Sequence, residues 1–126
     1  MMSKKTQLII AGISGFTAVA LGAFGAHGLK SLLLPDMLEI YKTGILYQLI
    51  HSVVLLALAL SSNMKLTMAF VLILTGIILF SFSLYLYSMT GLLFFAMVTP
   101  LGGVSLLIGW LAIIYTAVKD KNNHVL

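Results

Sequence analysis

A glutamine and a histidine stand at the head of a long apolar run in the middle of this sequence. Gln48 and His51 belong to the stretch YQLIHS, which the apolar residues VVLLALAL follow at once. Residues three and four apart lie on one face of a helix, so Gln48, His51 and Ser52 are expected to share a face. Because charging an imidazole in apolar surroundings is costly, we expect a neutral, hydrogen-bonded His51 ring inside a helical bundle. Its expected partners are Tyr47, Gln48, Ser81 or Ser83.

Other residues with chemical potential do not combine into a metal, haem or hydrolytic site. The chain has no cysteine, which excludes thiolate catalysis and cysteine zinc sites. His27 lies near the end of an earlier apolar run, whereas His51 lies about 12 Å inside its own run at about 1.5 Å per residue, so the two rings are not expected to meet. The three carboxylates stand outside the apolar runs, so no Ser-His-Asp arrangement can be drawn among them. We therefore expect no enzyme activity, no metal and no cofactor.

The composition places these residues in a lipid bilayer. Of the 126 residues, 61% are hydrophobic and 8% charged, with a mean hydropathy of +1.16, whereas a soluble domain is about 25% charged. A helix needs about 20 mostly apolar residues to cross a hydrocarbon layer about 30 Å thick. Four segments qualify, which predicts an all-α, four-helix transmembrane bundle in one domain, residues 1–126. The expected spans cover residues 8–27, 43–62, 66–88 and 99–118.

Pro100 interrupts the last apolar stretch, residues 92–118, which holds no charge. Proline cannot donate the backbone bond that a continuous helix requires. It either kinks one long helix or begins a shorter one with Thr99 as the N-cap. We favour the second interpretation, because threonine followed by proline matches the preferences for the N-cap and first helical positions. Residues 89–98 would then form a connector near the membrane interface.

Between the first two spans, residues 29–42 carry apolar side chains at helical spacing among polar ones, which predicts a short helix lying on the membrane surface. The net charge of +4 comes from seven lysines, without arginine. They stand near the ends of the apolar runs, a pattern typical of membrane orientation rather than of nucleic-acid binding. With four spans, five of the seven lysines fall on the same side of the membrane: Lys4, Lys5, Lys65, Lys119 and Lys121. Because lysines are enriched on the cytoplasmic side, both termini are expected to be cytoplasmic.

Small residues predict where the helices pack, because helices in a bilayer associate through close backbone approach. Two spans carry a face of small residues at helical spacing. On the first span these are Ala11, Gly15, Ala18, Gly22 and Gly25. On the fourth they are Gly102, Ser105, Gly109, Ala112 and Thr116.

Four blocks of the sequence resemble, in order, the signature of a bacterial membrane protein family, domain of unknown function 423. The blocks are ISGFTAVALGAFGAHGLK, YQLIHS, FSFSLYLYSMTG and VTPLGGVSLLIGW, and the resemblance covers nearly the whole chain. It implies a four-span inner-membrane protein and supplies no reaction, substrate or cofactor. Phe82 stands where the resemblance leads us to expect glycine. The residues that it singles out are Gly22, Gly25, His27, Tyr47, Gln48, His51, Ser81, Ser83, Tyr85, Thr99, Pro100, Gly102, Gly103, Gly109 and Trp110.

Two functions are compatible with these residues. We expect a small non-enzymatic protein that contacts the lipid bilayer or other membrane proteins, including copies of itself. The alternative is a subunit of an oligomeric transporter or channel for ions or small molecules, with Gln48 and His51 lining the pathway. The two differ in whether the face of Gln48, His51 and Ser52 lines a wet cavity or is sealed by neighbouring helices. The candidate functional or polar-network residues are His27, Tyr47, Gln48, His51, Ser81, Ser83 and Thr99.

Overall fold

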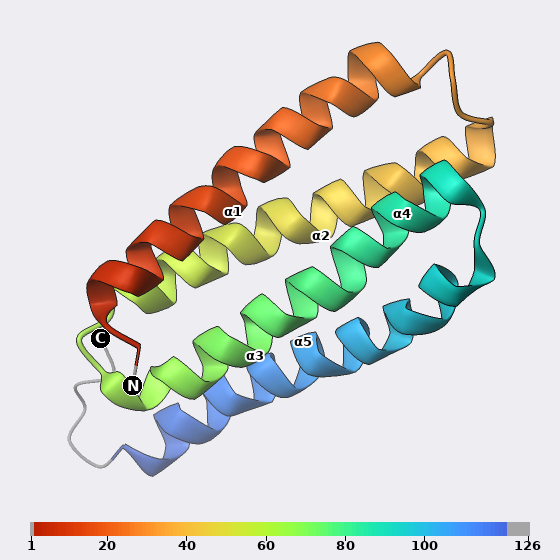
Figure 1. Cartoon of the computed structure of the whole chain (residues 1–126). Coiled ribbons are helices and arrows are strands. Elements are labelled where there is room, and N and C mark those ends of the chain that lie inside the picture. The colour runs from red at the N-terminus through yellow and green to blue at the C-terminus, as the bar shows by residue number, and fades with distance from the viewer. Residues whose placement is uncertain (1, 121–126) are drawn as a thin grey trace.

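Long antiparallel helices run the length of the molecule in the computed structural model, which describes residues 2–120 (Figure 1). Helix α1 (Lys4–Phe24) continues into the π-helical segment η1 (Gly25–Leu29), and α2 spans Pro35–Leu60. A 3₁₀ turn η2 (Met64–Leu66), α3 (Thr67–Ile77), the π-helical segment η3 (Ile78–Phe82) and α4 (Ser83–Thr90) form one further rod, and α5 spans Leu93–Lys119. Four helices of the described part are long and apolar enough to cross a membrane. The predicted all-α, four-span architecture is confirmed.

Local residue chemistry explains where the helices begin and end. The Ser3 hydroxyl caps α1 by accepting a hydrogen bond from the Thr6 N–H at 3.1 Å. Pro35 stands in the first turn of α2, where its missing N–H costs nothing. Gly91 ends α4 in the left-handed conformation, with φ of 67°, which glycine adopts without strain. The rod and α5 are therefore joined by a tight turn.

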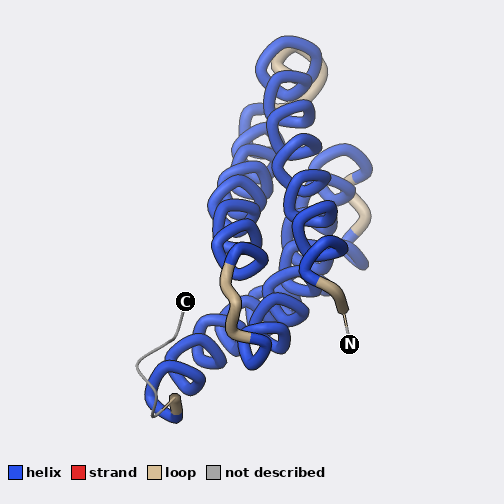
Figure 2. Tube along the Cα trace, turned by 90° about the vertical axis from the view of Figure 1, so that its left-hand side faces the viewer, coloured by secondary structure: helices blue, strands red, loops and turns tan. Residues whose placement is uncertain are grey.

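In the view of Figure 1, α2 lies between α1 and the α3–α4 rod, and Figure 2 shows the same helices from the side, packed as a bundle. Helix α1 packs along α2, while α5 packs along the other side of the rod, against α3, η3 and α4. α1 and α5 are consequently the outer helices of the array. The residues of α2 can therefore meet partners from both α1 and the rod.

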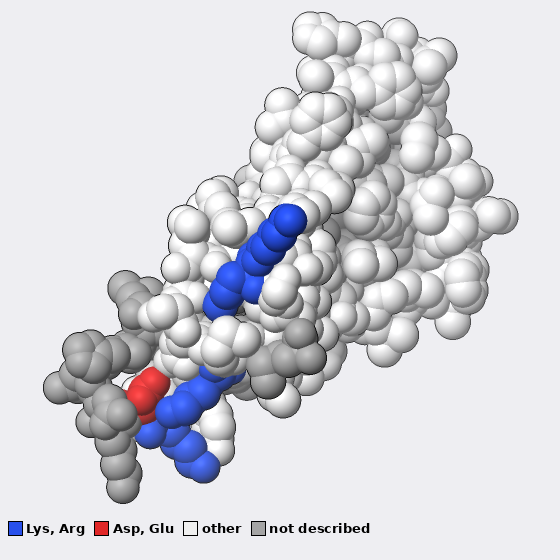
Figure 3. All heavy atoms as spheres, turned by 60° about the vertical axis from the view of Figure 1, so that its left-hand side comes forward, with Lys and Arg blue, Asp and Glu red and all other residues white. Residues whose placement is uncertain are grey.

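Lysines gather near the end of the molecule where α2 ends and α3 begins (Figure 3). The Lys4 ammonium donates to the Gln7 side-chain oxygen and to the Leu58 carbonyl, both at 3.3 Å. The Gln7 amide, which is fully buried, donates to the Thr67 hydroxyl at 3.3 Å. These bonds join α1, α2 and α3 at this end.

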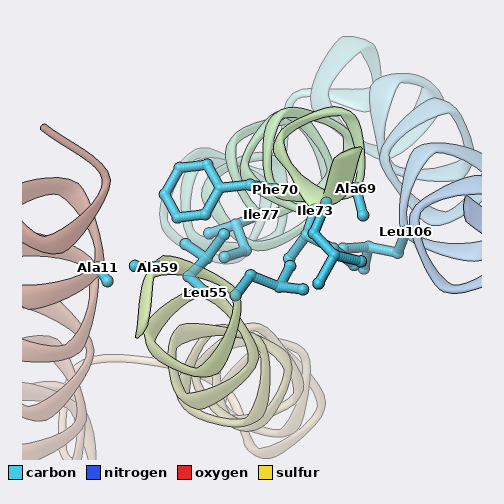
Figure 4. Packing of buried hydrophobic residues seen from close by; sticks show 10 residues of the cluster. Ala11, Leu55, Ala59, Ala69, Phe70, Ile73, Ile77 and Leu106 are labelled. Atoms are coloured by element: carbon cyan, nitrogen blue, oxygen red, sulfur yellow. The ribbon is translucent and has the colours of Figure 1, made fainter. Parts of the chain in front are cut away.

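The main apolar core lies between α2, α3 and α5 (Figure 4). Leu55, Phe70 and Ile73 have no exposed surface. Figure 4 shows Ala11 and Ala59 facing one another where α1 meets α2. Small side chains at this contact allow the two backbones to approach closely.

The separate interfacial helix that we expected over residues 29–42 is not confirmed. Leu29 ends η1, a turn follows, and the residues from Pro35 onward are the first turns of α2 itself. The helical spacing in this segment is real, but nothing between Pro35 and the apolar run ends the helix. The second span therefore begins earlier than its apolar composition suggests.

The favoured interpretation of Pro100 is wrong, because Pro100 lies inside the continuous helix α5. The connector expected over residues 89–98 is reduced to the turn at Gly91 and Leu92. Neighbouring side chains and helix contacts let membrane helices tolerate proline. Here Thr99, the residue before the proline, places its hydroxyl 2.7 Å from the Ser83 hydroxyl of α4, so this part of α5 packs against the rod.

Glycines create the closest helix contacts. At Gly102 an added Cβ would meet the backbone of Phe80, and at Gly109 it would lie 2.7 Å from Ile73 Cδ1. Gly15 differs, because no heavy atom lies within 4 Å of that position. The space around the other glycines of the packing faces also differs from one glycine to the next. A Cβ would press on the Tyr41 ring at Gly25, lie 3.3 Å from Ile45 at Gly22 and make ordinary contact with Phe80 at Gly103. Gly44 faces Tyr85, and Gly76, which the sequence did not single out for packing, faces Leu106.

Candidate functional site in the bundle interior

The Gln48 side chain, fully buried in the middle of α2, bonds to helices on both sides. Its amide nitrogen donates to the Thr17 hydroxyl at 2.9 Å and to the Ser14 carbonyl at 3.0 Å, both in α1. Its amide oxygen accepts a hydrogen bond from the Tyr85 hydroxyl of α4 at 2.6 Å. The glutamine therefore joins three helices with every polar atom of its side chain in use.

Serine hydroxyls extend this network in two directions. Ser52, one turn along α2, donates to the Gln48 carbonyl at 2.6 Å and lies 2.6 Å from the Ser14 hydroxyl. Ser81 in η3 donates to the Gly44 carbonyl at 2.8 Å. Ser83 donates to the carbonyl of Phe80 at 2.8 Å. The predicted residues Gln48, Ser81 and Ser83 thus have polar partners, although neither serine bonds to His51 in the structure.

The His51 ring is 6% exposed and has a partner at each nitrogen. Nδ1 lies 2.7 Å from the Tyr47 carbonyl, and Nε2 lies 3.1 Å from the indole nitrogen of Trp110 on α5. An indole N–H can only donate, so Nε2 must accept and the imidazole proton must reside on Nδ1. This geometry suits a neutral ring. A second ring proton would point at the Trp110 N–H and break that bond.

Aromatic rings surround His51 at the surface between α2 and α5. The Tyr47 ring stacks on the imidazole with centroids 5.9 Å apart, and Trp110 meets it edge-on at 6.0 Å. Together with Phe80 and Leu106 they border a hollow of about 290 Å³. Tyr47 and Trp110 are 39% and 43% exposed, so this hollow opens on the membrane-facing surface. We call it the aromatic hollow.

The structure does not bring all the candidate residues together. His27 is exposed in η1 at the end of the first rod, whereas His51 lies within α2. Thr99 contacts Ser83 and belongs to the contact between α4 and α5. Within residues 2–120, no group of three or more histidine, aspartate or glutamate side chains is suited to hold a metal ion.

Sequence reasoning missed the partners that come from distant segments. Trp110 lies 59 positions from His51, and Tyr85 lies 37 positions from Gln48. The family resemblance singled out Tyr85 and Trp110, but it did not indicate which residues they contact. Ser14 and Thr17, three residues apart on the first span, carried a usable signal, because two hydroxyls on one face of an apolar helix indicate a polar contact.

Comparison with known proteins identifies relatives over nearly the full length of the chain. The family model described as "Protein of unknown function (DUF423)" matches residues 21–103. The UPF0382 membrane protein YwdK of Bacillus subtilis is 40% identical over 120 residues, which cover 91% of this chain and 98% of that protein. The UPF0382 inner membrane protein YgdD of Escherichia coli K12 is 39% identical over 128 residues, 98% of each chain.

A UPF0382 membrane protein of Haemophilus influenzae is 40% identical over 124 residues, 94% of this chain and 98% of that protein. No solved structure shows a significant similarity to the chain. The four apolar helices agree with the membrane assignment in these names. The resemblance found in the sequence blocks is confirmed, and the chain belongs to the DUF423 family of multi-pass membrane proteins.

Proposed function

We propose that this chain is a non-enzymatic protein of the bacterial inner membrane that works by contacting lipid or other membrane proteins. The observation that supports this role is the completeness of the interior hydrogen bonding. Among the described residues, no buried side-chain nitrogen or oxygen lacks a partner. A transport pathway needs polar groups that exchange their bonds with water or cargo, whereas Gln48 and Ser52 bond to neighbouring helices and to their own. The polar face is therefore a tether between helices.

The alternative, a subunit of an oligomeric transporter or channel, is favoured by one observation. His51 borders the aromatic hollow, and the exposed Tyr47 and Trp110 beside it could face a second subunit. In that case His51 would exchange its bond to Trp110 during transport. The two proposals differ in whether His51 is needed for flux.

Liposomes test this difference. Purified full-length protein in vesicles with an internal pH dye should leak protons and potassium no faster than protein-free vesicles do. His51→Leu should give the same rates, with a modest loss of thermal stability, because it removes one contact between α2 and α5. Flux several times above the protein-free rate, abolished by His51→Leu in a protein that circular dichroism reports as folded, would instead support the transporter.

We also propose that both termini are cytoplasmic. Lys4, Lys5, Lys65 and Lys119 lie at one end of the array, while Lys121 lies outside the described residues. At the other end, Lys30 and Lys42 are balanced by Asp36 and Glu39, and the Lys42 and Glu39 side chains pair at 2.8 Å. By the positive-inside rule, the end with the lysine excess faces the cytoplasm.

Single cysteines test the orientation cleanly, since the chain has none of its own. In intact cells, an impermeant thiol reagent should label Ser31→Cys, in the exposed turn after η1, and should leave Ser3→Cys unlabelled. Both should react once the membrane is permeabilised. The reverse pattern in intact cells would invert the proposed topology.

A further inference from the structure

A second hollow, of about 340 Å³, opens between the beginning of α3 and the end of α5. Because α3 begins and α5 ends here, the hollow is polar at its outer end and apolar further along the helices. Lys65 precedes α3 and Lys119 is the last residue of α5, whereas Met68 and Ala112 lie deeper in the spans. We call it the lysine groove, lined by Lys65, Met68, Ala112, Tyr115, Thr116 and Lys119.

The cationic groups of the lysine groove are positioned and only partly neutralised. The Lys119 ammonium lies 4.8 Å from the centre of the Tyr115 ring. The Lys65 ammonium lies 3.5 Å from an Asp120 oxygen, and its side chain is 64% exposed. Asp120 is held mainly by Asn63, whose amide donates to its other oxygen at 2.7 Å. Two lysines and one aspartate leave a net charge of +1, and each ammonium has N–H donors to spare.

Lys4, at the same end of the molecule, has a different role. Its ammonium bonds to Gln7 and to the Leu58 carbonyl, so it is occupied in joining helices. Within residues 2–120, Lys65 and Lys119 make no such bond to another helix's backbone. Unlike Lys4, Lys65 and Lys119 therefore keep charge that is available to a ligand in the lysine groove.

We propose that the lysine groove binds one anionic phospholipid, with Lys65 and Lys119 contacting its phosphate and an acyl chain lying along Met68 and Ala112. Charge complementarity carries the assignment. The two ammonium groups stand at the ends of spans, which is the depth of the headgroup layer. Basic pockets between membrane helices on the cytoplasmic side recognise anionic headgroups. A zwitterionic lipid would bring its own cation toward both lysines and is disfavoured.

The inference deepens the proposed function and rests on it for the contact with lipid. Proton flux and headgroup preference are separate measurements, however, so either proposal can fail without the other. Lipid binding in detergent can also be measured whichever side of the membrane the lysine groove faces.

Native mass spectrometry of the full-length protein, mixed with phosphatidylglycerol or phosphatidylcholine of identical acyl chains, provides the test. The wild type should retain phosphatidylglycerol about thirtyfold better, since each of the two lysines near the headgroups adds about 1 kcal/mol. The double variant Lys65→Gln, Lys119→Gln should lose this preference. Lys30→Gln, at the other end, should keep it, and so should Lys65→Arg, Lys119→Arg, which preserves both charges.

Three results would overturn the proposal. One is a wild type without headgroup preference, and another is a glutamine double variant that keeps it. The third is displacement of phosphatidylglycerol by inorganic phosphate at equal concentration, because an anion site without a lipid groove would behave in that way. Thermal melts of all variants establish that lost binding does not reflect lost folding.

Discussion

Gly102→Leu should destabilise the protein by more than about 3 kcal/mol, above the usual range for overpacked sites. The Cβ of any larger residue at Gly102 would overlap backbone atoms of Phe80 and Leu79. A backbone cannot rotate away as a side chain can, so α5 would have to separate from η3. Thermal unfolding followed by circular dichroism in one detergent measures the loss, and Gly102→Ala provides a milder version that should still be clearly destabilised.

Two other glycines serve as graded controls. Gly109→Leu meets the Ile73 side chain first, at 2.7 Å, and this side chain can partly move, so a loss of about 1–3 kcal/mol is expected. Gly15→Leu meets nothing within 4 Å and should melt close to the wild type. The assignment of close contacts would be wrong if the Gly102 and Gly15 variants melted alike.

Gln48→Leu is expected to lose about 1–3 kcal/mol, as much as Gly109→Leu. Leucine fills a similar volume but leaves the buried Tyr85 hydroxyl without its acceptor and the Thr17 hydroxyl without its donor. Polar bonds inside membranes average only about 0.6 kcal/mol. Gln48 should exceed this value because it is fully buried and makes three bonds at once. Equilibrium unfolding in mixed detergent and SDS measures the difference.

A double-mutant cycle identifies the bond responsible. Tyr85→Phe alone leaves the Gln48 oxygen unpaired, but in the Gln48→Leu background it removes an unpaired hydroxyl. The double variant should therefore lose less stability than the sum of the single variants. Tyr85→Phe combined with Ser105→Ala is the matched control, because Ser105 bonds separately to the Leu72 carbonyl. Additive losses for Gln48 and Tyr85 would refute the bond.

The sequence by itself determined the membrane architecture. Four apolar segments of sufficient length predict four spans, because crossing the hydrocarbon layer depends on local composition and length alone. The spacing of Gln48, His51 and Ser52 also predicted a buried polar face correctly, and all three are at most 6% exposed. The periodicity of the second span alone indicates which of its faces is buried, because that face is defined by residues of one helix.

Local preferences misled where a neighbouring helix decides the outcome. Threonine followed by proline is a good helix start in isolation, yet α5 runs through Pro100 with Thr99 against Ser83 and Gly102 against Phe80. Thr99 and Pro100 would look the same in the sequence whether they began a helix or lay inside one. Only the helix packed beside them distinguishes these outcomes.

Small residues illustrate the same limit. Gly15 and Gly22 stand on one predicted face, but Ile45 lies near Gly22 whereas Gly15 faces open space. Gly76, which no pattern had selected for packing, lies under Leu106. A glycine permits close approach, but it does not specify which helix approaches.

Tyr47, an expected partner of His51 from the same helix, supplies its carbonyl, whereas the partners from other helices were decided by the tertiary structure. Trp110 reaches His51, and Tyr85 reaches Gln48, only because α2 lies beside the α3–α4 rod and α5 follows that rod back. The spacing of polar residues along one helix indicates which face of that helix needs hydrogen-bond partners. The group that satisfies it depends on the relative position and rotation of all four helices, which many weak contacts, distributed over the whole chain, determine together.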